Sequence, residues 1–108
     1  LYPGLDSHPQ RKIAKEQMNN GGAMLAFETI GAKKDTFAFM NGLQIIDISN
    51  NLGDSKSLIT HPATTTHSNI EPEEQLKINI TATMCRLSVG LENCDDLIND
   101  LKQALDSI

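Results

Sequence analysis

The sequence is poor in basic residues. Its 9 Lys and Arg stand against 14 Asp and Glu, which gives a net charge of −5 and a pI of about 5.0. A protein that binds nucleic acid usually presents a basic face to the phosphate backbone. The charge balance therefore argues against nucleic acid as a partner.

The sequence also lacks any apolar run close to the roughly 20 residues that a membrane span needs, and it does not open with the pattern of a signal peptide. We therefore expect a cytoplasmic protein with no membrane partner. The chain starts at Leu1 without a methionine, directly in a turn-like LYPG. We interpret it as a domain of a longer polypeptide.

Clusters of metal-ligating residues are missing as well. Cys85 and Cys94 lie nine positions apart and form no CxxC pattern, so the sequence supports neither a zinc site nor thioredoxin-like redox chemistry. We expect both thiols in the core. His61 and His67 are six positions apart without a third ligand, which is a poor metal site. No metal site is predicted.

What the sequence does contain fits one compact domain. A chain of 108 residues has a radius of gyration of about 13 Å and buries about two-thirds of its surface. The pattern predicts the order helix, strand, helix, strand, strand, helix, strand, helix, which fits an α+β fold of two layers with helices on one face of a sheet. The expected helices begin at Asp6 or Ser7, cover Lys33–Met40, extend from Pro72 to about Asn79, and run from Cys94 to the end; the expected strands are Ala23–Ile30, Leu43–Ser49, Ser57–Thr60 and Thr83–Val89.

Hydrophobic spacing predicts which residues these elements bury. The strand Ala23–Ile30 is apolar on both faces and is expected in the interior of the sheet. The residues of the last helix that fall largely off its apolar face are Asp95, Asp96, Asn99, Asp100, Lys102 and Gln103. The expected buried helix residues are Ile13, Ala14 and Met18 in the first helix, Phe37 and Met40 in the second, and Cys94, Leu97, Ile98, Leu101, Ala104, Leu105 and Ile108 in the last.

The strand Thr83–Val89 carries the side chain of most chemical interest. Successive residues of a strand point to opposite faces, so Cys85, Leu87 and Val89 share one face while Met84, Arg86 and Ser88 share the other. If the apolar set faces the helices, Arg86 emerges on the uncovered face. An arginine on a strand is a preorganised fork for a carboxylate or a phosphate, although most arginines are simply surface residues.

Asn51–His67, with the sequence NLGDSKSLITHPATTTH, is too polar for a core segment and is expected either to be solvated or to face a polar ligand. Its hydroxyl residues lack the glycine-flanked nucleophile elbow of a serine hydrolase. The acidic residues Glu73, Glu74, Asp95 and Asp96 stand where helices begin, which favours a role as helix-start charges over an acid/base pair.

Four stretches carry a resemblance to a known family: LYPGLDSHPQRKIAKEQ, GGAMLAFE, NLGDSKSLITHPATTTH and CRLSVGLENCDDLINDLKQAL. In this order they resemble the C-terminal domain of the Cys/Met-metabolism family of pyridoxal-phosphate (PLP) enzymes, and they span essentially residues 1–108. Asn51–Asp54 and Thr60–His67 look most like the O-succinylhomoserine and O-acetylhomoserine sulfhydrylases.

The resemblance implies a substrate-binding domain with a largely antiparallel sheet, from an enzyme of fold type I. It implies that Arg86 grips the α-carboxylate of the amino-acid substrate, helped by Asn51 and by Leu52 and nearby backbone. It also implies a PLP-binding domain upstream as partner, a tetrameric full-length enzyme, and no catalytic or cofactor-binding residue in this chain. The lysines, all outside anything like the family's lysine motif, are Lys12, Lys15, Lys33, Lys34, Lys56, Lys77 and Lys102.

Two positions depart from the family pattern, because Asn79 stands where glycine is usual and Cys85 where leucine or isoleucine is common. Asparagine can adopt the left-handed conformation that glycine would. Alternatives to a sulfhydrylase are cystathionine γ-synthase or a methionine or cystathionine γ-lyase and, from another class, a non-catalytic binding or assembly module. An uncovered sheet face is also expected to be apolar enough to associate with a partner or with itself.

Overall fold

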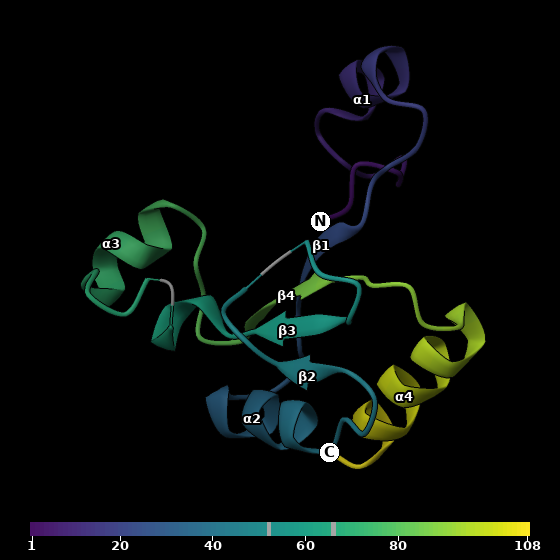
Figure 1. The fold of residues 1–108 in the computed structure, drawn as a ribbon. Helices are drawn as coiled ribbons and strands as arrows, with labels where there is room; N and C mark the ends of the chain where they lie inside the picture. Colours follow the sequence, from purple (N-terminus) through teal and green to yellow (C-terminus); the bar gives the residue numbers. More distant parts are fainter. Residues whose placement is uncertain (52, 66) are drawn as a thin grey trace.

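The computed structural model describes residues 1–51, 53–65 and 67–108. Its element order is the expected one, with a short 3₁₀ turn added after the third strand (Figure 1). The elements are α1 (Arg11–Gln17), β1 (Met24–Glu28), α2 (Lys33–Asn41), β2 (Asp47–Ile48), β3 (Leu58–Thr60), η1 (Pro62–Thr64), α3 (Pro72–Lys77), β4 (Met84–Ser88) and α4 (Cys94–Asp106).

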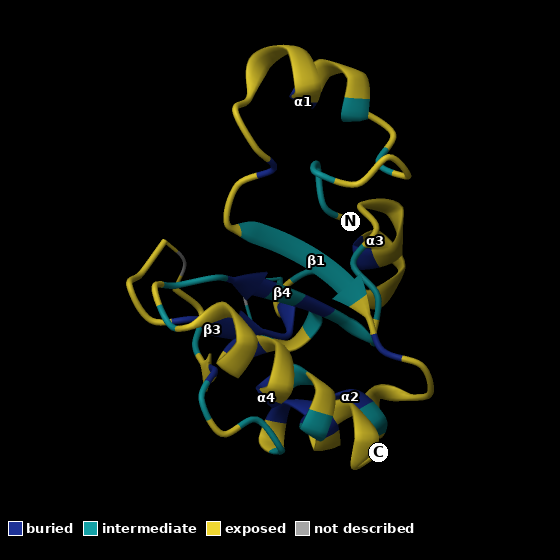
Figure 2. Ribbon diagram, turned by 90° about the vertical axis from the view of Figure 1, so that its right-hand side faces the viewer, coloured by how far each residue is buried: buried dark blue, intermediate teal, exposed yellow. Residues whose placement is uncertain are grey.

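The four strands form one sheet in the order β1-β4-β3-β2. β4 pairs antiparallel with both β1 and β3, and only β2 runs parallel to its neighbour β3. Helices α2 and α4 lie together beneath one face of this sheet (Figures 1 and 2). The predicted α+β fold with a largely antiparallel sheet is therefore confirmed.

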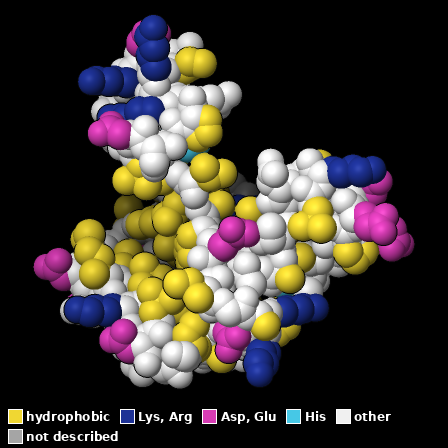
Figure 3. Space-filling view, turned by 180° about the vertical axis from the view of Figure 1, so that it is seen from behind, with side chains coloured by type: hydrophobic (Ala, Val, Ile, Leu, Met, Phe, Trp, Pro, Cys, Tyr) yellow, Lys and Arg dark blue, Asp and Glu magenta, His cyan; other side chains and the backbone are white. Residues whose placement is uncertain are grey.

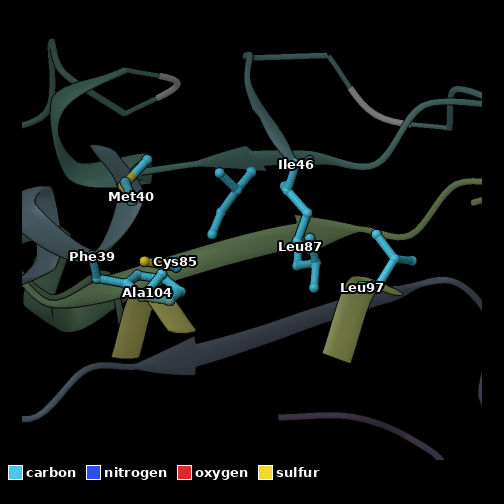
Figure 4. Close-up of a cluster of buried hydrophobic side chains, with 8 residues drawn as sticks. Phe39, Met40, Ile46, Cys85, Leu87, Leu97 and Ala104 are labelled. Carbon is cyan, nitrogen blue, oxygen red and sulfur yellow. The ribbon is translucent and has the colours of Figure 1, made fainter. Parts of the chain in front are cut away.

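The core fills the space between the sheet and these two helices. Cys85 and Leu87 point from β4 toward the helices, as the alternation predicted (Figure 4). Val89 packs against the same cluster. The rings of Phe27 and Phe39 meet edge to face at 5.9 Å. The buried residues of this core cluster are Phe39, Met40, Ile46, Ile59, Cys85, Leu87, Leu97 and Ala104.

Several burial predictions are wrong. β1 is an edge strand, because β4 rather than β1 sits between two partners. In α2 the buried aromatic residue is Phe39, while Phe37 is exposed and contacts the ring of His61. Cys94 is exposed at the start of α4. Three further residues of the predicted α4 stripe are exposed as well: Ile98, Leu105 and Ile108.

Helix α1 stands away from the sheet and is exposed over most of its length (Figure 2). It starts at Arg11 rather than near Ser7, and only Ala14 of its predicted stripe is buried. Because α1 has no sheet to cover, the other two residues of that stripe, Ile13 and Met18, are exposed. This projection also explains a radius of gyration of 14.3 Å, slightly above the expected value.

The buried carboxylate of Asp100 fixes the chain that enters β2. It accepts hydrogen bonds from the backbone N–H groups of Gln44, Ile45 and Ile46 at 2.8 to 2.9 Å, and from the Gln103 amide at 3.1 Å. These backbone groups therefore bind a carboxylate instead of a strand, which is why β2 begins only at Asp47 and not at Leu43. The prediction that Asp100 lies off the buried face is wrong, since it is only 4% exposed.

Helix α3 ends at a left-handed asparagine. Asn79 has φ 62°, and it is the one non-glycine residue with positive φ among the described residues. The N–H of Asn79 bonds to the carbonyl of Leu76, and that of Ile80 to the carbonyl of Gln75, which is the Schellman arrangement. The expected conformation of Asn79 is confirmed. Across the described ranges no helix is long and apolar enough to cross a bilayer.

We expect Asp100→Asn to lower the free energy of unfolding by about 2 kcal/mol, because an amide cannot accept all the hydrogen bonds that the buried carboxylate accepts. Urea denaturation of the 108-residue chain measures the change. Asp106→Asn is the matched control, since Asp106 is exposed in the same helix. Equal stabilities for the two variants would contradict the anchoring role of Asp100.

The same contact predicts a pH dependence. Burial raises the pKa of Asp100, but the N–H groups of Gln44, Ile46 and Ile45 and the Gln103 amide outweigh it, so the pKa lies below its ordinary value of 3.8. A lowered pKa in the folded state contributes stability above pH 3.8 that is lost as pH falls through the folded-state pKa. The difference between wild type and Asp100→Asn should therefore shrink below about pH 4.

A second stability prediction concerns the left-handed residue. Asn79→Gly should leave the unfolding free energy unchanged or raise it slightly, whereas Asn79→Ala should lower it by about 1 kcal/mol, because alanine pays the steric cost of positive φ. Thermal unfolding of both variants checks this. If alanine proved as stable as glycine here, the Schellman end of α3 would not constrain the fold.

Candidate functional site

Arg86 occupies the middle of the sheet face that α2 and α4 leave uncovered. It sits on the central strand β4, directly opposite Ala26 of β1 and Thr60 of β3. Its neighbours Cys85 and Leu87 belong to the core, so the alternation of the strand forces the arginine to the opposite face. The side chain is half-buried. The predicted placement of Arg86 is confirmed, while its role stays a prediction.

The guanidinium is held by the turn that follows β2. Nη2 of Arg86 donates to the backbone carbonyl of Asn50 at 3.1 Å. Among the described residues this is the one hydrogen bond of a group with five N–H donors. The remaining donors are free to bind an anion, and a planar fork of this kind matches a carboxylate in two parallel hydrogen bonds.

Hydroxyl groups surround this arginine on the same face. Thr60 Oγ1 lies 2.9 Å from Thr65 Oγ1 and 3.4 Å from the side-chain oxygen of Asn50. On the other side of Arg86, Ser88 is buried, and its Oγ accepts a hydrogen bond from the N–H of Gly53 at 3.0 Å. The centre of the uncovered face is therefore polar, so the expectation of an apolar face is wrong there.

The loop between β2 and β3 is tied down at its far end by Glu92. The carboxylate of Glu92 accepts from the N–H of Ser57 at 2.9 Å and from its hydroxyl at 2.8 Å. The Ser57 hydroxyl in turn accepts from the N–H of Gly90. The backbone N–H of Ser57 is the main cause that holds the pKa of Glu92 below its ordinary value, with burial opposing it. The loop is thus fixed both at Asn50 and at Ser57.

Asn51 is the residue that follows Asn50, whose carbonyl receives Arg86, and its predicted role stays a prediction. Asn51 is exposed, and its N–H donates to Ser49 Oγ at 3.2 Å. The third predicted residue, Leu52, lies outside the described residues. Sequence reasoning did not identify the parts played by Asn50, Thr60 and Thr65. Alternation along β3 could have placed Thr60 on this face, but no local pattern pairs it with Asn50.

Both ring nitrogens of His61 are bound within the protein. His61 is buried, with Nε2 at 2.7 Å from the carbonyl of Ala82 and Nδ1 at 2.8 Å from Thr64 Oγ1. Because a carbonyl only accepts, Nε2 carries the hydrogen. The part of the chain that the structure describes holds no group of three His, Cys, Asp or Glu side chains suited to a metal. Cys85 is buried, and burial raises the pKa of its thiol to about 12.

The lysines of this chain do not fit a covalently bound PLP. A Schiff-base lysine must be enclosed together with groups that hold the ring and the phosphate. All seven lysines of the sequence are exposed. Lys56 pairs with Asp47, Lys77 pairs with Glu74, and Lys33 lies over the ring of Phe37. Within the described residues, therefore, no lysine has an enclosed setting of this kind.

Exposed apolar side chains gather on another part of the surface. Seen from behind, hydrophobic groups spread over the side of the molecule below α1 (Figure 3). A hollow of about 660 Å³ there is lined by residues that include Phe27, Ile30, Leu105 and Ile108. This apolar surface follows the edge of the sheet and the end of α4, and a second hollow on the side of the sheet that carries Arg86 is lined by residues that include Leu1, Ala26, Leu76 and Met84.

Comparison with known proteins gives consistent matches along the whole chain. Residues 1–106 match the Cys/Met metabolism PLP-dependent enzyme family. O-succinylhomoserine sulfhydrylase of Mycobacterium tuberculosis is 50% identical over 109 residues, covering 96% of this chain and 27% of the relative. L-methionine gamma-lyase of Porphyromonas gingivalis is 48% identical, covering 99% of this chain and 27% of the relative. The chain thus spans about a quarter of these relatives.

Solved structures agree with this assignment. A putative O-acetylhomoserine (thiol)-lyase of Campylobacter jejuni, which carries N′-pyridoxyl-lysine-5′-monophosphate, matches 97% of this chain and 25% of its own, with a TM-score of 0.91 and 44% identity. Cystathionine gamma-lyase of Lactobacillus plantarum in complex with L-serine matches 99% of this chain and 28% of its own, with a TM-score of 0.91 and 42% identity. The chain therefore belongs to the Cys/Met metabolism family of PLP-dependent enzymes.

Proposed function

We propose that residues 1–108 are the C-terminal substrate-binding domain of a PLP-dependent O-acylhomoserine sulfhydrylase. Such an enzyme replaces the acyl group of O-succinyl- or O-acetylhomoserine with sulfide and produces homocysteine for methionine biosynthesis. The observation that supports this proposal is the half-buried Arg86, whose guanidinium is held at one point by Asn50 and keeps its other donors free. Arg86 binds the α-carboxylate of the amino-acid substrate.

Binding by Arg86 contributes orientation as well as affinity. Two parallel hydrogen bonds from a guanidinium fix both the position and the plane of a carboxylate. With the carboxylate fixed at one end and the rest of the substrate held elsewhere in the site, rotation about Cα is restricted, which helps to set the direction of the bond from Cα to its hydrogen. Asn51 stands beside this site and completes the carboxylate contacts together with nearby backbone. Leu52 remains part of the proposed site on the basis of family resemblance alone.

PLP is supplied by another part of the full-length enzyme, as the family resemblance implies, because the lysines of this chain lie outside anything like the family's lysine motif. When bound, it serves as the electron sink that stabilises a carbanion formed at the substrate. The partners of this chain are then the substrate and its own cofactor domain, in a cytoplasmic tetramer. The apolar hollow lined by Phe27, Ile30 and Leu105 adds a surface that a neighbouring domain or subunit covers.

The choice between sulfhydrylase and lyase rests on few residues. The resemblance of Asn51–Asp54 and Thr60–His67 to the sulfhydrylases favours that activity. A γ-lyase is the second candidate, because L-methionine gamma-lyases match this chain at 46 to 48% identity, close to the 50% of the sulfhydrylase from M. tuberculosis. Assaying the full-length enzyme with O-acylhomoserines and sulfide, and separately with methionine, distinguishes these activities.

Arg86→Lys in the full-length enzyme keeps the charge but loses the planar fork. We expect a loss of about 2 kcal/mol in transition-state stabilisation, which is a fall of roughly thirtyfold in kcat/KM. The absorbance of the lysine-bound cofactor should stay as in the wild type. Arg11→Lys is the matched control, because Arg11 is the other arginine of the chain and lies on the projecting α1. Equal kinetics for both variants would refute the role of Arg86.

The isolated 108-residue chain should be catalytically silent, because it lacks an enclosed lysine to anchor the cofactor. On titration with PLP, absorbance should show only weak, non-stoichiometric Schiff bases with exposed lysines. A saturable band of one equivalent, assigned to a single lysine by reduction and mass spectrometry, would show that the cofactor site lies in this chain after all.

A further inference from the structure

The threonines beside Arg86 form a hydrogen-bond chain with a fixed direction. Each threonine hydroxyl has one hydrogen to donate. Thr65 Oγ1 donates to the backbone carbonyl of His61 at 2.7 Å, which uses its hydrogen because a carbonyl can only accept. The contact of 2.9 Å between Thr60 and Thr65 must therefore be donated by Thr60.

The direction of this chain decides which atom of the Asn50 amide faces Thr60. A hydrogen of Thr60 that points to Thr65 cannot also be donated to the Asn50 side-chain oxygen 3.4 Å away, so only the oxygen of the Thr60 hydroxyl is left to face Asn50. In the structure the Asn50 atom 3.4 Å from Thr60 is Oδ1, but the oxygen and nitrogen of an amide are assigned from hydrogen bonding, and the exchanged orientation, with Nδ2–H toward Thr60, is the one from which this hydroxyl oxygen can accept. The chain then runs from the Asn50 amide through Thr60 and Thr65 to the carbonyl of His61.

The hydrogen-bond chain begins at Asn50, the residue that holds Arg86. The side chain of Asn50 contacts Thr60, and its backbone carbonyl accepts from Arg86 at 3.1 Å. Thr60 and Arg86 are direct cross-strand neighbours, so all three groups lie on one face of the sheet. Asn50 itself is exposed, and backbone pairing reaches only the preceding residue, where the N–H of Ser49 bonds to the carbonyl of Ile59.

We propose that Asn50, Thr60 and Thr65 are positioning residues that fix the Asn50 carbonyl and thereby hold the Arg86 guanidinium in the plane required for a substrate carboxylate. The inference rests on the proposed function of Arg86 and adds what sets its geometry. Thr60 is 1% exposed, so its hydrogen bonds are shielded from competing water. A directional chain with one hydrogen per link also admits a single arrangement, which suits a rigid site.

Carboxylate recognition is measured directly as the ratio of KM for an O-acylhomoserine to KM for its α-carboxamide, in the full-length enzyme. Thr65→Val keeps the shape of the side chain and removes the hydroxyl. We expect it to raise KM for the carboxylate substrate about fivefold, the effect of losing one hydrogen bond, with kcat nearly unchanged and KM for the carboxamide unaffected. Thr65→Ser restores the hydroxyl and should recover the wild-type ratio.

Two further variants keep the experiment decisive. Asn50→Ala removes the amide at an exposed position where folding is not at risk, and it should reduce carboxylate discrimination as Thr65→Val does. Thr83→Val is the control, because within the described ranges the Thr83 hydroxyl makes no hydrogen bond, and its KM ratio should equal that of the wild type.

The outcomes separate this inference from the function on which it rests. If Arg86→Lys lowers discrimination but Asn50→Ala and Thr65→Val do not, Arg86 binds the carboxylate without the threonine chain and the positioning role is overturned. If Arg86→Lys itself leaves discrimination unchanged, the proposed carboxylate site is wrong. If Thr65→Val lowers carboxylate discrimination and Thr65→Ser does not restore it, the effect comes from packing rather than from the hydroxyl. This result would also overturn the proposal.

Discussion

The alternation of side chains along the central strand β4 is the constraint on which the rest of the molecule depends. β4 has a strand on each side, and its residues Cys85 and Leu87 complete the core against α2 and α4. Burying these two residues forces Arg86 and Ser88 to the opposite face. Core packing and the candidate site are thus set by one register, and a shift by one residue would bury the arginine among apolar side chains.

Two carboxylates fix the segments that lead into the neighbouring strands β2 and β3. Asp100 on α4 holds the three backbone N–H groups that lead into β2, and Glu92 beyond β4 holds the loop that leads into β3. Both bind backbone donors that a longer strand would otherwise have paired. The turn at Asn50 lies between these two anchors, so the carbonyl that receives Arg86 is placed by contacts at either end of its segment.

Sequence patterns predicted the element order, the two faces of β4 and the left-handed Asn79, because each depends on local periodicity or on one residue's conformational freedom. These patterns failed where contacts between residues far apart in the sequence determine the local structure. The late start of β2 depends on Asp100, more than 50 residues away, and the edge position of β1 depends on how β4 pairs. Likewise, Arg86 was identified from its strand, whereas Asn50 and Thr65 enter the site only through tertiary contacts.

The central claim is that Arg86 binds the α-carboxylate of an amino acid, and a structure of the full-length enzyme with a bound amino-acid substrate or analogue tests it most directly. The account predicts the carboxylate oxygens within about 3 Å of the Arg86 guanidinium nitrogens, in a two-point contact, with the Asn50 carbonyl still accepting from Nη2. A carboxylate bound elsewhere, with Arg86 remaining in contact with protein or solvent only, would contradict it.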